Sequence, residues 1–188
     1  MFSHRVPSGA MTETQTGVRV DLAREGAANV ATGLPVLDHL VGELARAARF
    51  KLSLEVAPGS TDQAVVAAGR ALGAALGERL VGNAGNGWAL TPADEALALA
   101  SLECDGQPRF VTNVDFSDQR VGGLSTDVAS TFLQELAVAA GLNLHVRLVE
   151  GTDPQHVLAA IFKAVGAALG QACRPVTGDS EPREREGS

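Results

Sequence analysis

The chain has 188 residues, of which 45% are hydrophobic, and it carries a formal net charge of −7 at pH 7. This length suits one domain or two small fused half-domains, and the hydrophobic share is large enough to build a core. The acidic balance disfavours nucleic acid as a partner, no apolar run is long enough to cross a membrane, and the N-terminus lacks the apolar core of a signal peptide.

The first half of the chain alternates strands and helices after an N-terminal segment, residues 1–12, that we expect to be flexible. Alternating apolar residues predict strands over residues 17–22, 27–32 and 50–56. An apolar stripe predicts a helix over residues 37–48, with Pro35 near its start. Thr61 or Asp62 is expected to cap a second helix that runs to about Leu80, and the glycine-rich residues 82–87 predict a loop.

The second half shows the same order of elements. Strands are predicted over residues 96–103, 109–115 and 142–149, and helices over residues 127–140 and 154–173. We place the two half-domains at residues 13–91 and 92–176, and we expect the polar tail, residues 177–188, to be disordered. Cys104 and Cys173 lack the spacing of paired ligands, so we expect reduced thiols and a cytoplasmic location.

Two pairs of segments repeat at a spacing of about ninety residues. The segment that begins at Glu43-Leu44-Ala45 matches the one at Glu135-Leu136-Ala137, and residues 71–77 match residues 164–170. The repeat indicates two copies of one helix–strand–loop–helix unit. Strands and helices in this order predict an α+β fold of duplicated half-domains, each a small sheet with helices on one face.

Three histidines lie at the edges of elements in the repeated unit, namely His39, His145 and His156. Each of them alone is more often a packed or solvated side chain than a ligand, but three imidazoles together suit a divalent ion such as manganese or zinc. Ala159 and Ala160 stand where a helical metal site usually repeats a ligand after His156. Lys163 follows on the same helical face and either binds phosphate or is an ordinary surface lysine.

Several motifs resemble those of the imidazoleglycerol-phosphate dehydratase family of histidine biosynthesis. They are Glu13-Thr14, residues 32–40, residues 92–98, Leu144-His145-Val146 and Phe162-Lys163-Ala164. The resemblance covers roughly residues 12–174 and implies the fold of that family, which is like domain 2 of ribosomal protein S5. It also implies two manganese ions held between subunits, and assembly into large oligomers.

The resemblance assigns metal ligands position by position, and most of them are replaced in this chain. His39, His145 and His156 match family histidines, and Asp62 stands at the first histidine of one His-His-x-x-Glu motif. The two glutamates of these motifs fall on Val66 and Ala159. We therefore expect no cofactor at full occupancy, and manganese only if the site functions.

The phosphate-binding residues of the family are also reduced, because its Ser-Gly-Arg-Pro arginine falls on Gln107. We expect Lys163, Asp94 and Glu95 to contact substrate and Glu13 to take part in any catalysis. The leading hypothesis is a dehydratase-like protein whose activity is weak or lost and which serves as a scaffold, partner or binder of a small phosphorylated ligand. It would form a homo-oligomer, or a mixed oligomer with a related dehydratase.

Two alternatives stay open. The chain could be a functioning dehydratase with a remodelled metal site. It could also be a different enzyme that uses Asp94, Glu95 or Glu13 as general acid or base, for which the sequence selects no substrate.

Overall fold

The computed structural model describes residues 16–22, 25–116 and 120–175. The expected flexible segment 1–12, Glu13 and the tail 177–188 lie outside the described residues. The limits of the two half-domains stay a prediction. Within the described part of the chain, no helix is long and apolar enough to cross a membrane.

The elements follow the α+β order that the sequence predicts. The first half comprises β1 (Gly17–Leu22), β2 (Ala27–Ala31), α1 (Pro35–Ala48), β3 (Phe50–Glu55) and α2 (Thr61–Leu80). The second comprises β4 (Asn86–Ala93), β5 (Ala96–Glu103), β6 (Arg109–Thr112), β7 (Arg120–Val121), β8 (Leu124–Ser125), α3 (Asp127–Ala140), β9 (Asn143–Glu150) and α4 (Pro154–Ala172).

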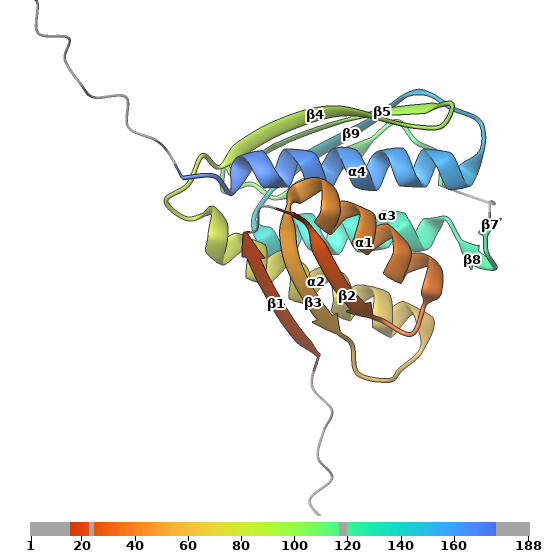
Figure 1. Ribbon diagram of the computed structural model, residues 1–188, viewed down its shortest axis with the longest axis horizontal. Helices are drawn as coiled ribbons and strands as arrows, with labels where there is room; N and C mark the ends of the chain where they lie inside the picture. The colour runs from red at the N-terminus through yellow and green to blue at the C-terminus, as the bar shows by residue number, and fades with distance from the viewer. Residues whose placement is uncertain (1–15, 23–24, 117–119, 176–188) are drawn as a thin grey trace, which may run out of the picture.

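Two sheets enclose the helices (Figure 1). The first sheet has the strand order β1-β3-β2 and the second has β4-β5-β9-β6, while β7 and β8 form a separate hairpin. Helices α1 and α2 contact the first sheet, α3 and α4 contact the second, and the helices pack in the pairs α1 with α4 and α2 with α3. The core is therefore a helical layer between two sheets, rich in small side chains and leucines.

The internal repeat is visible in the helix packing. Gly166 of α4 lies against the carbonyl oxygen of Leu44, and Gly73 of α2 lies against that of Leu136 at the matching position. A methyl group at either glycine would overlap that oxygen. The repeated glycines thus allow both helix pairs to approach closely, and the predicted duplication is confirmed.

The expectation of a loop over residues 82–87 is wrong at its end, because β4 begins at Asn86. This strand was not predicted because it contains Gly87 and Pro92, two residue types that are uncommon within strands. Gly87 lies so close to the carbonyl oxygen of Ala168 that no larger residue fits. Pro92 is tolerated because β4 lies at the edge of its sheet, where one row of N–H groups needs no partner strand.

Candidate active-site pocket

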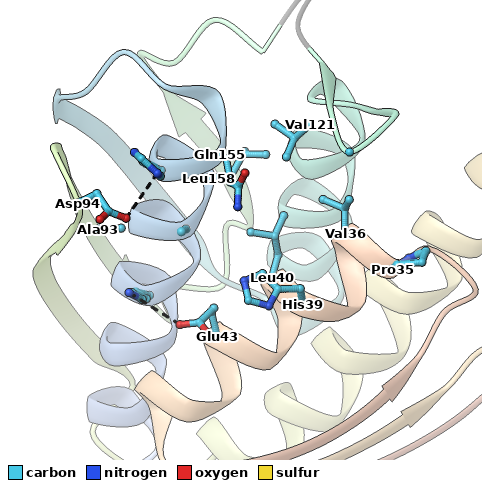
Figure 2. Close-up of a pocket in the computed structure, with 14 residues that line it drawn as sticks. Pro35, Val36, His39, Leu40, Glu43, Ala93, Asp94, Val121, Gln155 and Leu158 are labelled. Carbon is cyan, nitrogen blue, oxygen red and sulfur yellow. Dashed lines mark ion pairs between the residues drawn. The ribbon is translucent and has the colours of Figure 1, made fainter.

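A cavity of about 450 Å³ opens where α1, α4, the β4–β5 turn and the β7–β8 hairpin meet. Figure 2 shows side chains of α1 and α4 facing each other across it, with Asp94 at one edge and Val121 at another. Its polar lining consists of His39, Glu43, Asp94, Gln155, His156 and Lys163. Its apolar lining includes Val36, Leu40, Val121 and Leu158. The cavity has a size common for small-molecule sites.

The neighbour of His39 fixes how α1 presents this histidine. The carboxylate of Asp38 accepts hydrogen bonds from the backbone N–H and the hydroxyl of Thr32, at 2.8 and 2.6 Å. Pro35 begins the helix, where its missing N–H costs nothing. Asp38 therefore fixes the loop before α1, and the exposed imidazole of His39 lines the cavity.

The first turn of α4 positions His156. Asp153 caps the helix by accepting the backbone N–H of Gln155 at 2.8 Å. Glu95, in the β4–β5 turn, accepts the backbone N–H of Asp153 at 3.0 Å and contacts Nδ1 of His156 with its other oxygen. The other ring nitrogen, Nε2, lies 3.5 Å from Asp94 Oδ2 (Figure 2).

These contacts change the pKa values of both partners. The backbone N–H of Asp153, followed by the imidazole of His156, lowers the pKa of Glu95 to about 2. The hydrogen bond with Glu95 raises the pKa of His156, although partial burial opposes this shift. Both ring nitrogens of His156 thus face carboxylates, and the charged imidazolium is favoured.

Lys163 lies further along α4 and forms an ion pair with Glu43 of α1. Its Nζ is 3.8 Å from Glu43 Oε2, and the same glutamate also accepts a hydrogen bond from Arg46. Burial acts to raise the pKa of Glu43, but the hydrogen bond from Arg46 and the nearby charges lower it overall. The repeat contains an equivalent pair, in which Arg70 Nε lies 2.6 Å from Glu135 Oε2.

The remaining predicted site residues lie elsewhere. His145 is in β9, opposite Ser101 and Val111, on the face of the second sheet that points away from the helices. Asp62 is exposed in the first turn of α2. The structure thus brings His39, Asp94, His156 and Lys163 to one cavity, with Glu95 against it, and leaves His145 and Asp62 out. The roles assigned to all these residues stay predictions.

Sequence reasoning missed Glu43 and the β7–β8 hairpin as parts of the cavity. Glu43 lies one helical turn after His39, and it opens the repeated Glu-Leu-Ala segment, so helical spacing from His39 could have identified it. The hairpin offers only the short segment Val121-Gly122, which no local pattern connects to α1.

The described residues of a single chain do not gather into a site for the pair of manganese ions that the resemblance implies. In the structure Nδ1 of His156 contacts Glu95 and Nε2 lies 3.5 Å from Asp94 Oδ2, so its ring faces these carboxylates and not another histidine. His145 lies on a different face from His39 and His156. Among the described residues, no three histidine, cysteine, aspartate or glutamate side chains gather in a way that could hold a metal ion.

Comparison with known proteins identifies a family. The sequence profile of imidazoleglycerol-phosphate dehydratase matches residues 32–169. A dehydratase of that name from Desulfitobacterium hafniense is 37% identical over 169 residues, which cover 86% of this chain and 86% of that protein. The chloroplastic enzyme of Pisum sativum is 34% identical over 180 residues, covering 92% of this chain, which spans 62% of the pea protein's length.

Solved structures agree with the sequence matches. Imidazoleglycerol-phosphate dehydratase from Staphylococcus aureus superimposes with a TM-score of 0.78 at 25% identity, covering 86% of this chain and 95% of that one. The Pyrococcus furiosus protein, solved in complex with (S)-C348, gives a TM-score of 0.75 at 24% identity over 88% of this chain and 93% of that one, and shows likeness of fold.

Proposed function

The chain belongs to the imidazoleglycerol-phosphate dehydratase family, and we propose that it binds a small phosphorylated imidazole in the pocket of His39, His156 and Lys163 with weak or no dehydratase turnover. The observation that carries this proposal is the position of His156 between Asp94 and Glu95. A histidine held as imidazolium by two carboxylates serves as a hydrogen-bond donor and a cation, and it does not serve as a metal ligand.

Two cations of the cavity can contact an anionic group of a ligand, and the carboxylates of Glu43 and Asp94 in the same lining offset part of their charge. The imidazolium of His156 and the ammonium of Lys163 both line the cavity, and His39 adds a further ring that can donate a hydrogen bond. Apolar side chains such as Leu40 and Leu158 line the rest and suit the carbon skeleton and the flat ring of an imidazole compound. In this proposal the ligand occupies the space between α1 and α4.

Calorimetric titration with an imidazole phosphate tests the binding role. We expect saturable binding to the wild type and binding weakened about tenfold or more by Lys163→Gln, because a charge-assisted contact is lost. Arg70→Gln is the matched control, since it removes the equivalent cation of the repeat, which pairs with Glu135 away from the cavity. Equal losses in both variants, or no binding at all, would contradict the proposal.

A functioning dehydratase with a remodelled metal site is the second candidate. Identities of 34% and 37% to proteins named as dehydratases, over most of the chain, favour it. Growth of a histidine auxotroph that expresses this chain would support it, as would stoichiometric manganese that is lost on His39→Ala or His145→Ala. No rescue despite good expression would support the first candidate.

The proposal includes assembly with further copies of this chain or with a related dehydratase, and a cytoplasmic location. An apolar patch on the outer face of the second sheet, which includes the exposed side chains of Trp88 and Leu90, supports self-association. Cys104 and Cys173 are both free, as expected of a chain in a reducing compartment. Size measurement of the purified protein and its location in intact cells test these two parts separately.

A further inference from the structure

The outer face of the first sheet carries a second cavity, of about 310 Å³, which shares no lining residue with the pocket of His39. Arg19 of β1 and Lys51 of β3 line it, together with the polar side chains of Asn29 and Ser53. The sheet register places Arg19 beside Ser53, and Ser53 beside Asn29, in one row across the three strands. Lys51 lies in the next row on the same face, between Asp21 of β1 and Ala27 of β2.

Positive charge is in excess in this cavity, although the whole chain is acidic. The one carboxylate in its lining, that of Asp21, is held by Arg79 of α2, with 2.8 Å between Arg79 Nη2 and Asp21 Oδ1. Among the residues that the structure describes, neither Arg19 nor Lys51 has a carboxylate within ion-pair distance. Asp21 stands opposite Lys51 in the sheet but is ion-paired with Arg79, so Arg19 and Lys51 can both contact a partner from solution.

The other copy of the repeat shows that the fold does not need these cations. Leu52 pairs with Val20 in the first sheet, and Leu144 pairs with Leu102 at the matching position of the second. By this register, Ser101 takes the place of Arg19 and Asn143 takes the place of Lys51. Arg109, beside Asn143, takes the place of Ala27. The first sheet therefore has Arg19, Lys51 and the small side chain of Ala27 at positions where the second sheet has Ser101, Asn143 and Arg109.

We infer that this cavity binds the phosphate group of a small phosphate ester. An arginine fork and a lysine ammonium are the side chains that most often contact phosphate oxygens. The hydroxyl of Ser53 and the amide of Asn29 add two neutral donors in the row beside Arg19. The cavity is larger than a phosphate ion needs, which leaves room for the organic part of an ester.

Calorimetric titration with glycerol 3-phosphate and with inorganic phosphate tests the inference at low salt. We expect tighter binding of the ester, and a loss of about tenfold in affinity for each of Arg19→Gln and Lys51→Gln. All the substituted residues are exposed on strands, so the fold is expected to persist. NMR shifts of the Asn29 and Ser53 amides in the titrated wild type give a second reading that needs no variant.

Arg109→Gln and Arg147→Gln, on the second sheet, are matched controls for charge. An equal loss of affinity in these controls would mean that binding depends only on the net charge of the protein, and it would overturn the inference. An absence of NMR shifts at Asn29 and Ser53 would overturn it as well. Equal or tighter binding of inorganic phosphate would overturn the assignment of an ester. The outcome is independent of the pocket of His39, because Lys163→Gln is expected to leave this binding unchanged.

Discussion

Glu95 connects the β4–β5 turn to the first turn of α4 through its contacts with Asp153 and His156. The protonation of Glu95 and His156 therefore makes the stability of this part of the fold depend on pH. The pKa of Glu95 is lowered from 4.5 to about 2, so its contribution to stability is complete above pH 4.5 and is lost as pH falls toward 2. The pKa of His156 is raised above 6.5, so its contribution is complete below pH 6.5 and is lost as pH rises through the higher folded value. The pair thus stabilises the fold most between pH 4.5 and pH 6.5.

We predict that Glu95→Gln flattens this pH profile, because the glutamine neither charges nor holds the proton of His156. Urea denaturation midpoints measured from pH 3 to about pH 9 check the profile. An NMR titration should show the pKa of His156 moving down toward its ordinary value in the variant. Glu103→Gln, the same change at the far end of β5, serves as control. Identical profiles for the wild type and Glu95→Gln would contradict the prediction.

Glu43 competes with any anionic ligand for Lys163. We predict that Glu43→Gln increases the affinity of the pocket for an imidazole phosphate about twofold to fivefold, the range expected when a partly exposed ion pair is removed. Titration calorimetry measures this change. Glu135→Gln removes the same charge from the equivalent pair with Arg70, outside the cavity, and should leave the affinity unchanged. A weaker affinity in Glu43→Gln would mean that Glu43 itself helps to bind the ligand.

The sequence could name the residues of the pocket but not their pairing. His39, Asp94, His156 and Lys163 were all predicted site residues, and all line one cavity. The contact between Glu95 and His156 joins residues far apart in the chain, and it exists only because the β4–β5 turn packs on α4. The alternation of Leu144, His145 and Val146 does predict that His145 lies on the face opposite its two apolar neighbours, and both of these are buried in β9.

At the scale of elements, the repeated glycines decide how closely the helices pack. We predict that Gly166→Ala lowers the free energy of unfolding by about 1–3 kcal/mol, because the new methyl group overlaps the backbone of Leu44 and pushes α1 from α4. Urea denaturation measures this effect. Gly77→Ala is the control, since its methyl group would sit 3.4 Å from Ala140 and meet ordinary contact. There the better helix propensity of alanine leaves stability unchanged or raises it by up to about 1 kcal/mol.

Elements with a strong period were predictable from the sequence, and irregular ones were not. The helix over residues 127–140 agrees with α3, and the one over residues 154–173 agrees with α4 to within a residue. The strand β4 was missed because it contains a glycine and a proline, which are uncommon in strands. The glycine is explained by close packing against α4 and the proline by the position of β4 at the sheet edge, neither of which the sequence shows. The short strands β7 and β8 carry too few residues for any alternation to be recognised.

At the scale of the whole molecule, the outer faces of the two sheets differ. The first presents polar side chains such as Arg19, Lys51 and Ser53. The second presents a patch, here named the sheet patch, formed by Trp88, Leu90, Leu97, Leu99 and Val149. Within it Trp88 is 64% exposed and Val149 58% exposed. Because the architecture is the same in both halves, the apolar character of this patch is not required by the fold, and we predict that it is an interface.

The occupant that we expect on the sheet patch is a second copy of the chain. Charges of both signs border the patch: Arg147 and Glu150 of β9 lie beside Leu99 and Leu97, and Glu103 ends β5. Two copies can therefore face each other with opposite charges apposed. We predict that Trp88→Ser reduces the assembly to smaller species at micromolar concentration, measured by sedimentation velocity. Val81→Ser, which removes a side chain that is 81% exposed at the end of α2, should leave the assembly intact. Assembly unchanged by Trp88→Ser, or a wild type that is monomeric throughout, would exclude the sheet patch as the contact between copies.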